Sequence, residues 1–160
     1  MIEIVPFSSE HRDGVVALVL PIQQTEFGIA VKLEDQPDLL AIPQAYQTGA
    51  GNFWIAIERG EVIGTVGLID IGQRQVALRK MFVKAAFRGR EHGVGAKLLA
   101  TVLRWGPERQ LAEIYLGTTS KYLAAHRFYE KNGFVELGLS ELPAAFPRMA
   151  VDTKFYMRTF

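Results

Sequence analysis

In the middle of the chain, apolar residues alternate with polar or small residues, which is the period of a strand with one buried face. The alternation predicts three strands, over residues 52–58, 62–69 and 75–83. Arg59-Gly60-Glu61 and Gly72 stand between them, and short glycine-containing turns join neighbouring strands as hairpins. The central region is therefore expected to form an antiparallel meander.

Elsewhere apolar residues recur every three or four positions, the period of a helix that buries one face. This spacing predicts helices over residues 10–20, 94–105 and 121–131, and a less regular helix over residues 34–46 that Pro43 interrupts. Ser8 or Ser9 is expected to cap the first helix. Pro21 is expected to end that helix, Gly106-Pro107 to end the second, and Asn132-Gly133 to end the last.

Shorter apolar runs predict the remaining strands, over residues 2–7, 112–117, 134–137 and 151–157. A proline-containing loop over residues 142–149 separates the last two strands. The chain shows no repeat, low-complexity tract or linker, and its 160 residues are enough for one substantial core. We therefore expect a single domain over residues 1–160.

Composition narrows the class of protein. Hydrophobic residues make up 49% of the chain and charged residues 22%, which is typical of a folded globular protein. A net charge of +1 argues against a nucleic-acid partner bound through a broad basic surface. The absence of cysteine excludes thiol catalysis, disulfides and zinc–thiolate sites, and we predict no metal site. With neither a signal pattern nor a long apolar run, the chain is expected to be cytoplasmic, with no membrane partner.

The segment with the clearest chemistry follows the predicted strand over residues 75–83. Its loop contains Arg88, Gly89, Arg90, Gly93 and Gly95, and then opens into a helix. Glycines let the backbone approach a ligand closely, and the first N–H groups of a helix have no partner inside it. Together with the helix dipole and the arginines, these groups favour a bound pyrophosphate.

Two common phosphate-binding loops do not fit this segment. A Walker loop requires Gly-Lys-Ser/Thr after its glycines, whereas Gly95 is followed by Ala96 and Lys97. A dinucleotide-binding loop follows the first strand of a parallel unit, but this loop lies past the middle of the chain, after an antiparallel pattern.

A second motif follows further along the chain and reads Ala125-His126-Arg127-Phe128-Tyr129-Glu130-Lys131-Asn132-Gly133-Phe134. With Arg90-x-x-Gly93-x-Gly95 and Tyr129-Glu130-Lys131-x-Gly133-Phe134 in this order, the chain resembles the GCN5-related N-acetyltransferase (GNAT) family over residues 2–158. The resemblance implies an α/β fold of mixed α+β type: a mixed, mostly antiparallel central sheet with helices on both faces. It also implies that the sheet splays after the fourth strand and holds the cofactor in the resulting cleft.

The resemblance implies acetyl-CoA as the cosubstrate and assigns residues to it. In the family, the backbone of the fourth strand contacts the pantetheine arm and the thioester; these positions correspond to Met81, Phe82 and Val83. The pyrophosphate would be shared by the loop residues Arg88, Gly89, Arg90, Glu91, His92, Gly93, Val94, Gly95 and Ala96. This loop is about two residues longer than the compact family form, so either Arg88 or Arg90 occupies the leading arginine position.

The catalytic roles also follow from the resemblance. Tyr129 corresponds to the family tyrosine that protonates the departing thiolate, and an ordinary tyrosine pKa of about 10 keeps the phenol protonated at neutral pH. Many relatives carry a glutamate base on the fourth strand, near Ala77 of this chain, which cannot accept a proton. The base is therefore Glu26, Glu34, Asp70 or a chain of waters. Many family members have an asparagine that contacts the cofactor at a position corresponding to Tyr122. This chain has a tyrosine there, so that contact is not assigned.

The expected activity is acetyl-CoA-dependent N-acetyl transfer to a primary amine of a small molecule, or to an exposed amino group of a peptide. Transfer would be direct, because no cysteine is available for an acyl-enzyme. The main alternative is a non-catalytic acyl-CoA-binding sensor module. A third interpretation, a structural subunit, rests on the C-terminal aromatics Phe155, Tyr156 and Phe160, which either pack the last strand or form the seam of a homodimer.

Overall fold

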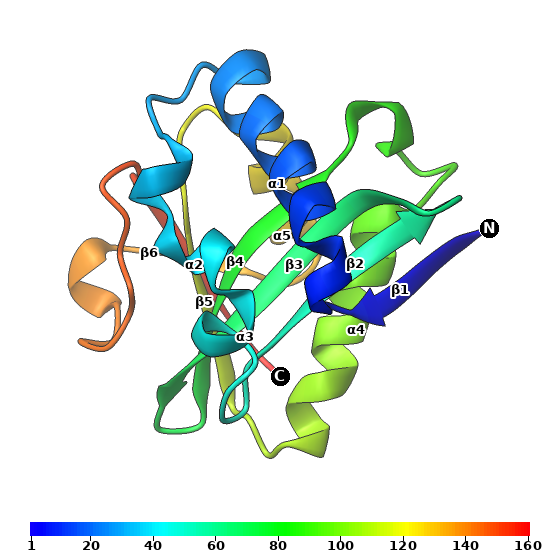
Figure 1. Cartoon of the computed structure of the whole chain (residues 1–160). Helices are drawn as coiled ribbons and strands as arrows, with labels where there is room; N and C mark the ends of the chain where they lie inside the picture. The colour runs from blue at the N-terminus through cyan, green and yellow to red at the C-terminus, as the bar shows by residue number, and fades with distance from the viewer.

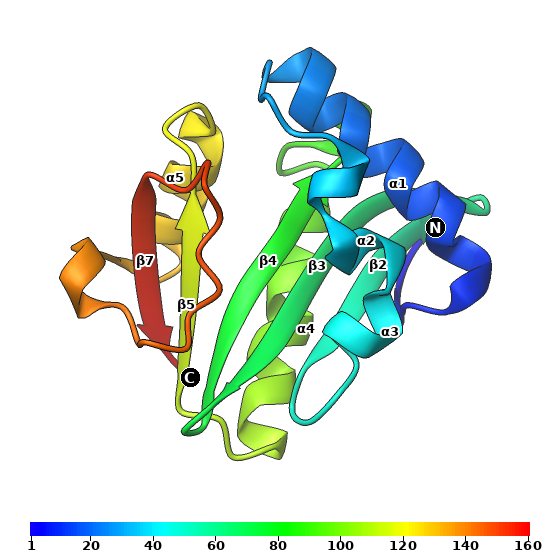
Figure 2. The same cartoon turned by 60° about the vertical axis from the view of Figure 1, so that its left-hand side comes forward.

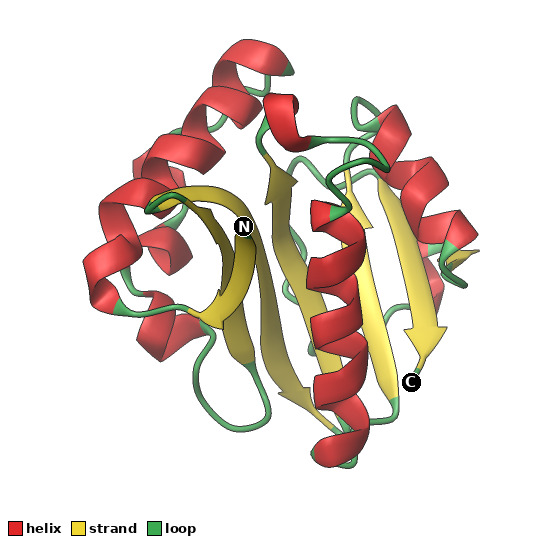
Figure 3. Cartoon of the chain, turned by 90° about the vertical axis from the view of Figure 1, so that its right-hand side faces the viewer, coloured by secondary structure: helices red, strands yellow, loops and turns green.

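The computed structural model describes all 160 residues as one mixed sheet with helices on both faces (Figure 1, Figure 3). The seven strands lie in the order β1-β2-β3-β4-β5-β7-β6, and only the β4–β5 pair runs parallel. The strands are β1 Ile2–Pro6, β2 Asn52–Glu58, β3 Glu61–Gly72, β4 Gln75–Val83, β5 Glu113–Thr118, β6 Val135–Leu137 and β7 Lys154–Thr159. The predicted fold class and the central meander are confirmed.

The helices divide between the two faces of the sheet. Near one face lie α1 Arg12–Pro21, α2 Pro37–Leu40 and α3 Ile42–Ala45, and on the other lie α4 Val94–Glu108 and α5 Leu123–Lys131 (Figure 2). A π-helical turn, η2 Ile22–Glu26, continues α1 directly. The single-turn 3₁₀ helices are η1 Ser9–His11, η3 Leu33–Asp35, η4 Ala85–Phe87 and η5 Leu139–Glu141.

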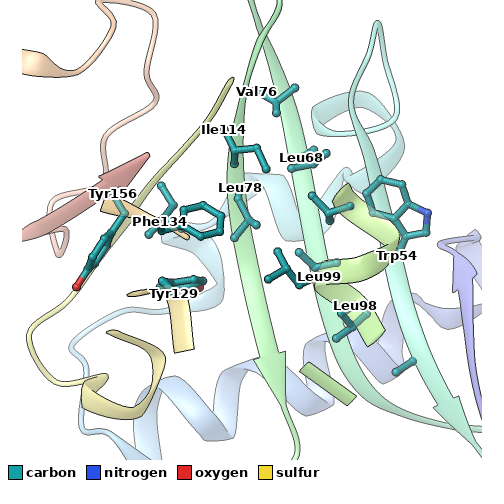
Figure 4. Packing of buried hydrophobic residues seen from close by; sticks show 14 of the residues in the cluster. Trp54, Leu68, Val76, Leu78, Leu98, Leu99, Ile114, Tyr129, Phe134 and Tyr156 are labelled. Carbon is teal, nitrogen blue, oxygen red and sulfur yellow. The ribbon is translucent and has the colours of Figure 1, made fainter. Parts of the chain in front are cut away.

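The largest hydrophobic core lies between the sheet and α4. Leu98 and Leu99 project from one stripe of α4 and share this core with Leu68, Leu78 and other residues of the strands (Figure 4). A second cluster packs on the opposite face, beneath α1, α2 and α3. The apolar positions of the predicted helices and strands are largely the residues that these two cores bury, and close packing holds the sheet on both sides of the opening between β4 and β5.

The two helix ends predicted at prolines have different outcomes. Helix α1 ends at Pro21, as predicted, although the π-helical turn η2 follows it directly. Pro107 lies inside α4, which ends at Glu108. Phe160 packs so closely against Gly106 that an added Cβ would lie 2.0 Å from the Phe160 ring. Position 106 therefore needs a glycine for packing, and this glycine does not mark the end of the helix.

The helix predicted over residues 34–46 is three short turns, η3, α2 and α3. Pro37 and Pro43 each occupy the first turn of a helix, where the missing N–H has no intrahelical partner to lose. Pro43 thus begins α3 and does not interrupt a longer helix. Neither Ser8 nor Ser9 caps a helix through its side chain, and the Ser8 hydroxyl contacts Glu10 instead.

Two element boundaries differ from those predicted near the C-terminus. Helix α5 begins at Leu123, two residues later than expected, and β7 covers Lys154–Thr159 where residues 151–157 were predicted. Phe155 and Tyr156 are buried in β7, and Phe160 packs on α4. The C-terminal aromatics therefore pack within their own chain. None of the helices combines the length and apolar character that a membrane crossing requires.

Candidate active site

The sheet opens between β4 and β5. These strands pair only at the start of β4, where Gln75, Val76 and Ala77 face Glu113, Ile114 and Tyr115. Beyond Ala77 the two strands diverge, as Figure 2 shows, and a cavity of about 640 Å³ occupies the gap. Its wall includes residues of η2, β4, the loop before α4, β5, α5 and the segment before β7. The splayed sheet that the resemblance implies is therefore present.

Strand β4 bulges beside this cavity. Thr65 of β3 pairs with Phe82 and Gly67 pairs with Arg79, so two residues of β4, Lys80 and Met81, lie opposite one residue of β3. Lys80 has a φ of 54°, and its carbonyl accepts a hydrogen bond of 2.6 Å from the Thr65 hydroxyl. A bulge of this kind leaves a residue out of the ladder and redirects neighbouring side chains. Met81, Phe82 and Val83, the three residues predicted to contact the cofactor, all line the cavity.

The loop before α4 presents a row of unused donors. The backbone N–H groups of residues 89–92 and 94–96 donate no hydrogen bond within the protein. Gly89 has a φ of 106°, and Gly93, the residue before α4, has a φ of 60°, so both adopt a backbone that other residues rarely tolerate. Free amides at a helix N-terminus form a site for an anion.

The structure separates the predicted loop residues into two groups. Those that line the cavity are Arg88, Gly89, Arg90, Gly93, Gly95 and Ala96. The side chain of Val94 is 1% exposed and belongs to the core beneath α4. Glu91 is exposed, and the ring of His92 lies 5.2 Å from that of Phe87. None of these three side chains lines the cavity, so only their backbone amides are available to bind the predicted pyrophosphate.

The two candidate arginines differ in their partners. Nη1 and Nη2 of Arg88 both donate to the Glu26 carboxylate, and Nε donates to the Val83 carbonyl at 2.8 Å. Arg90 forms no ion pair and is exposed at the cavity. Arg88 therefore links η2 to the end of β4, whereas Arg90 is free to contact an anion. The hydrogen bond from Arg88 also lowers the pKa of Glu26, which makes Glu26 a weak proton acceptor.

Tyr129 of α5 reaches the cavity from the core. Its side chain packs against Phe134 and Tyr156, with ring centroids 5.5 and 6.0 Å away (Figure 4). The hydroxyl makes no hydrogen bond to another protein group. Burial, with a smaller contribution from Tyr122, raises the pKa of Tyr129 well above the usual value for a phenol. Tyr129 is therefore protonated at neutral pH and is a proton donor without a protein acceptor.

Tyr122 presents a second hydroxyl to the same cavity. Its ring contacts Phe27 of the chain after η2 and Phe82 of β4 edge-on, at centroid distances of 4.8 and 6.0 Å. The hydroxyl oxygen is buried and has no hydrogen-bond partner. Burial, and then the charge of Glu26, raises the pKa of Tyr122 to about 12. A buried hydroxyl without a partner is rare in folded proteins, and this one belongs to a residue of the cavity wall.

A buried ion pair behind the bulge is absent from the sequence prediction. Lys80 has a side chain only 3% exposed, and its Nζ lies 3.4 Å from the Asp38 carboxylate of α2. The Tyr46 hydroxyl donates to the same carboxylate at 2.5 Å. Burial raises the pKa of Asp38, but Lys80 and Tyr46 outweigh it, and the pKa lies below the usual range. Burial lowers the pKa of Lys80 to about 8, although Asp38 opposes this.

Two further charged groups at this end of the cavity were also missed. Asp152 is 8% exposed, and its carboxylate accepts a hydrogen bond of 2.9 Å from the Met149 amide. The same carboxylate lies over Gly117 of β5, 2.7 Å from where a Cβ would be. Arg79 of β4 lines the cavity from the facing strand. The consecutive basic residues Arg79 and Lys80 within a buried strand were the one signal in the sequence that could have indicated this region.

The other bases proposed from the sequence do not reach the cavity. Ala77 is fully buried in a small cluster with Tyr115 and Phe155, so no carboxylate occupies its position. Glu34 is exposed and lies 3.9 Å from Lys32. Asp70 accepts hydrogen bonds from the amides of Ala50 and Gly72 at the far end of β3. Asp152 is the one carboxylate among the residues that line the cavity.

The depressed pKa of Lys80 predicts how stability depends on pH. An unfolded lysine has a pKa near 10.4, so between pH 8 and 10 the unfolded chain binds more protons than the folded chain. Lys80 alone should therefore raise the free energy of unfolding by about 2 kcal/mol over this range, whereas the raised pKa values of Tyr122 and Tyr129 should lower it near pH 10. Denaturant unfolding of the parent and of Lys80→Met at pH 8 and pH 10 isolates the Lys80 contribution as the difference between the two changes. Equal changes in the two proteins would refute the assignment.

The comparisons with known proteins agree with this geometry. Residues 17–134 match the model of the acetyltransferase (GNAT) family. A structure of an acetyltransferase of the GNAT family from Staphylococcus aureus Mu50 is 38% identical, covers 99% of both chains and superimposes with a TM-score of 0.96.

Two other relatives are more distant. N-acetylaspartate synthetase from Xenopus tropicalis is 35% identical over 106 residues, which are 65% of this chain and 38% of that protein, so the match spans little more than a third of the relative. PaiA N-acetyltransferase from Thermoplasma acidophilum, solved in complex with coenzyme A, shares the fold with a TM-score of 0.74 at 16% identity, covering 100% of this chain and 99% of that one. The family match over most of the chain and the full-length bacterial relative establish that the chain belongs to the GNAT family of acetyltransferases.

Proposed function

We propose that the chain is an acetyl-CoA-dependent N-acetyltransferase that acts on a primary amine of a small molecule or on an exposed amino group. The observation that carries this proposal is the cavity in the splayed sheet, which has free loop amides at one end and the protonated Tyr129 in its wall. The names of the relatives, which include N-acetyltransferases and an N-acetylaspartate synthetase, support the same reaction class.

The residues present fit acetyl-CoA. The unused amides of residues 89–92 and 94–96, with Arg90 beside them, would hold the pyrophosphate. The bulged stretch from Met81 to Val83 would hold the pantetheine arm, and the unpartnered hydroxyl of Tyr122 would gain a polar partner. When bound, acetyl-CoA supplies an acetyl group activated as a thioester.

The protein's part in the reaction is to orient the reactants and to manage protons. The attacking amine must be neutral, and the departing thiolate must receive a proton. Tyr129 would supply that proton, since its raised pKa keeps the phenol protonated and its hydroxyl has no competing acceptor in the protein. Transfer would be direct, because the chain has no cysteine to carry an acyl group.

The second candidate function is a non-catalytic acyl-CoA sensor. It is favoured by one observation, the buried alanine at position 77. The family resemblance implies that many members carry a glutamate near this position, which acts as the catalytic base. Tyr129 opposes it, since a sensor needs no proton donor beside the thioester. Release of thiol from acetyl-CoA in the presence of amines distinguishes the enzyme from the sensor.

Substitution of Gly95 tests the cofactor site. A Cβ at this position would lie 3.7 Å from Phe128, so the fold has room for alanine, which also favours the helix. Gly95→Val places a branched side chain where the backbone faces the anion, and should weaken acetyl-CoA binding at least tenfold, about 1.4 kcal/mol. Gly95→Ala is the matched control and should bind within a few-fold of the parent. Equal calorimetric affinity in a folded Gly95→Val variant would exclude this site.

A cytoplasmic location and a homodimer complete the proposal. The chain's lack of cysteine suits a reducing compartment. The homodimer is consistent with the exposed apolar residues Val135 and Leu139, which are 62% and 49% exposed on and beside the edge strand β6. Sedimentation equilibrium of the parent chain and of Val135→Lys measures whether this edge forms a dimer.

A further inference from the structure

We propose that the acceptor amine also carries a carboxylate, which binds the guanidinium of Arg79, while its ammonium group faces the carboxylate of Asp152. The inference rests on the proposed function and names the substrate class of the same cavity. It is carried by two opposite charges that face the cavity from different walls and do not pair with each other.

The first charge is Arg79 on the β4 wall. Its Nη2 lies 2.7 Å from the Met149 sulfur, and its side chain makes no hydrogen bond to oxygen and no ion pair. A thioether is a weak acceptor, and a half-buried guanidinium normally has carboxylate or carbonyl partners. The next residue, Lys80, is already neutralised by Asp38. Arg79 is thus a cation without an ion-pair partner on the cavity wall, where it fits a carboxylate.

The second charge is Asp152 on the opposite wall. It lies just before β7, is 8% exposed, forms no ion pair and accepts one hydrogen bond, from the Met149 amide. Its position over Gly117 places the carboxylate on the β5 side of the opening. A buried carboxylate with one amide partner retains free lone pairs, which an ammonium group of a ligand can satisfy.

Asp152 also completes the proton balance. One ammonium proton passes to the Asp152 carboxylate, and the neutral nitrogen then forms its bond to the thioester carbonyl carbon. The C–S bond breaks, the nitrogen gives up a second proton, and the sulfur receives one through Tyr129. The products are an amide, a free thiol and one proton, which Asp152 releases to water.

The surroundings of Asp152 suit this role. Burial raises the pKa of Asp152, and the Met149 amide together with the charges of Arg79, Lys80 and Arg148 opposes that rise. A carboxyl group with a raised pKa is a stronger base than an ordinary aspartate. An acceptor carboxylate on Arg79 would further increase its basicity by neutralising a nearby cation.

Matched acceptors test the inference on the intact chain. Thiol release is measured with glycine, β-alanine, aspartate and glutamate, and with the amide of each at its carboxyl groups. We expect at least one acid to exceed its amide tenfold or more in kcat/KM, mainly through KM. The comparison is conservative, because an amino amide has a lower amine pKa and is more reactive at neutral pH when binding is equal.

Substitutions at Arg79 and Asp152 test which residues produce the preference for acids over amides. Arg79→Gln should raise KM for the acid at least tenfold, bring the acid-to-amide ratio near one and leave KM for acetyl-CoA unchanged, whereas Arg79→Lys should retain part of the preference. Arg148→Gln removes the same charge near Asp152 from a side chain over Phe155, outside the cavity, and should keep the ratio. Asp152→Asn should lower kcat and remove the enzyme's acidic limb from the pH profile.

The failures are distinguishable. Equal turnover of acids and amides, or an unchanged ratio in Arg79→Gln, overturns the carboxylate inference and leaves N-acetyl transfer intact. Binding of acetyl-CoA without turnover of any acceptor overturns the proposed function and this inference with it.

Discussion

Tyr129→Phe should lower kcat about 10²- to 10⁴-fold, the usual range for loss of a positioned acid, and should leave KM for acetyl-CoA nearly unchanged. The phenol acts only as the thiolate departs, so its removal affects the transition state and not cofactor binding. The ring keeps its contacts with Phe134 and Tyr156, and the hydroxyl has no protein partner to lose. The fold should therefore be unaffected, and thermal unfolding checks this.

Tyr122→Phe is the matched comparison, because its hydroxyl is also unpartnered and its side chain lines the same cavity. Removing it should leave stability unchanged or slightly raised, since no hydrogen bond within the protein is lost. Its main effect should be on acetyl-CoA affinity. A Tyr129→Phe variant with the parent kcat, measured where chemistry limits the rate, would remove Tyr129 from the acid role, and a large kcat loss confined to Tyr122→Phe would assign that role to Tyr122.

Asp38→Ala should destabilise the fold by about 3–5 kcal/mol, the usual effect of removing one partner from a buried ion pair. The variant leaves the Lys80 ammonium buried without its carboxylate, and it also removes the acceptor of the fully buried Tyr46 hydroxyl. These three residues connect α2 and the C-terminal end of α3 to the bulge of β4. Denaturant unfolding at neutral pH measures the loss.

Lys80→Met provides the control for this pair. It removes the buried charge while keeping most of the side-chain volume, so it should destabilise less than Asp38→Ala. In the double variant, Asp38→Ala should cause a smaller loss than it does alone, and the difference is the coupling free energy of the pair. Additive losses would show that Asp38 acts through Tyr46 or helix α2 and not through Lys80.

The periodic parts of the sequence predicted the fold well, because they are the parts whose burial is decided by local pattern. The stripe from Val94 to Val102 appears as the buried face of α4. Residues 53–56 lie in the predicted strand, but the two cores bury both of its sides and not one face only. Two of the proline predictions were wrong, because a proline in the first turn of a helix loses no hydrogen bond and one near the helix end need not stop it. Pro43 begins α3 and does not interrupt a longer helix, and α4 continues past Pro107 to Glu108.

The site was predictable where motifs place backbone atoms and was not where tertiary geometry places side chains. The loop glycines and the cavity-lining Tyr129 follow from the two motifs, and the structure brings both to one cavity. Lys80 is buried against Asp38 and has a positive φ at the bulge, and the sequence pattern of β4 does not predict a bulge there. Asp152 reaches the cavity from an irregular segment with no periodicity, so its burial over Gly117 could not be anticipated.

The central claim is tested most directly by incubating the purified chain with acetyl-CoA and a panel of primary amines, and following thiol release together with the mass of the product. The account predicts thiol release in equal amount to an acetylated amine, with a marked loss in Tyr129→Phe. Calorimetric binding of acetyl-CoA with no thiol release above the amine-free rate for any acceptor would contradict it and would identify the chain as an acyl-CoA sensor.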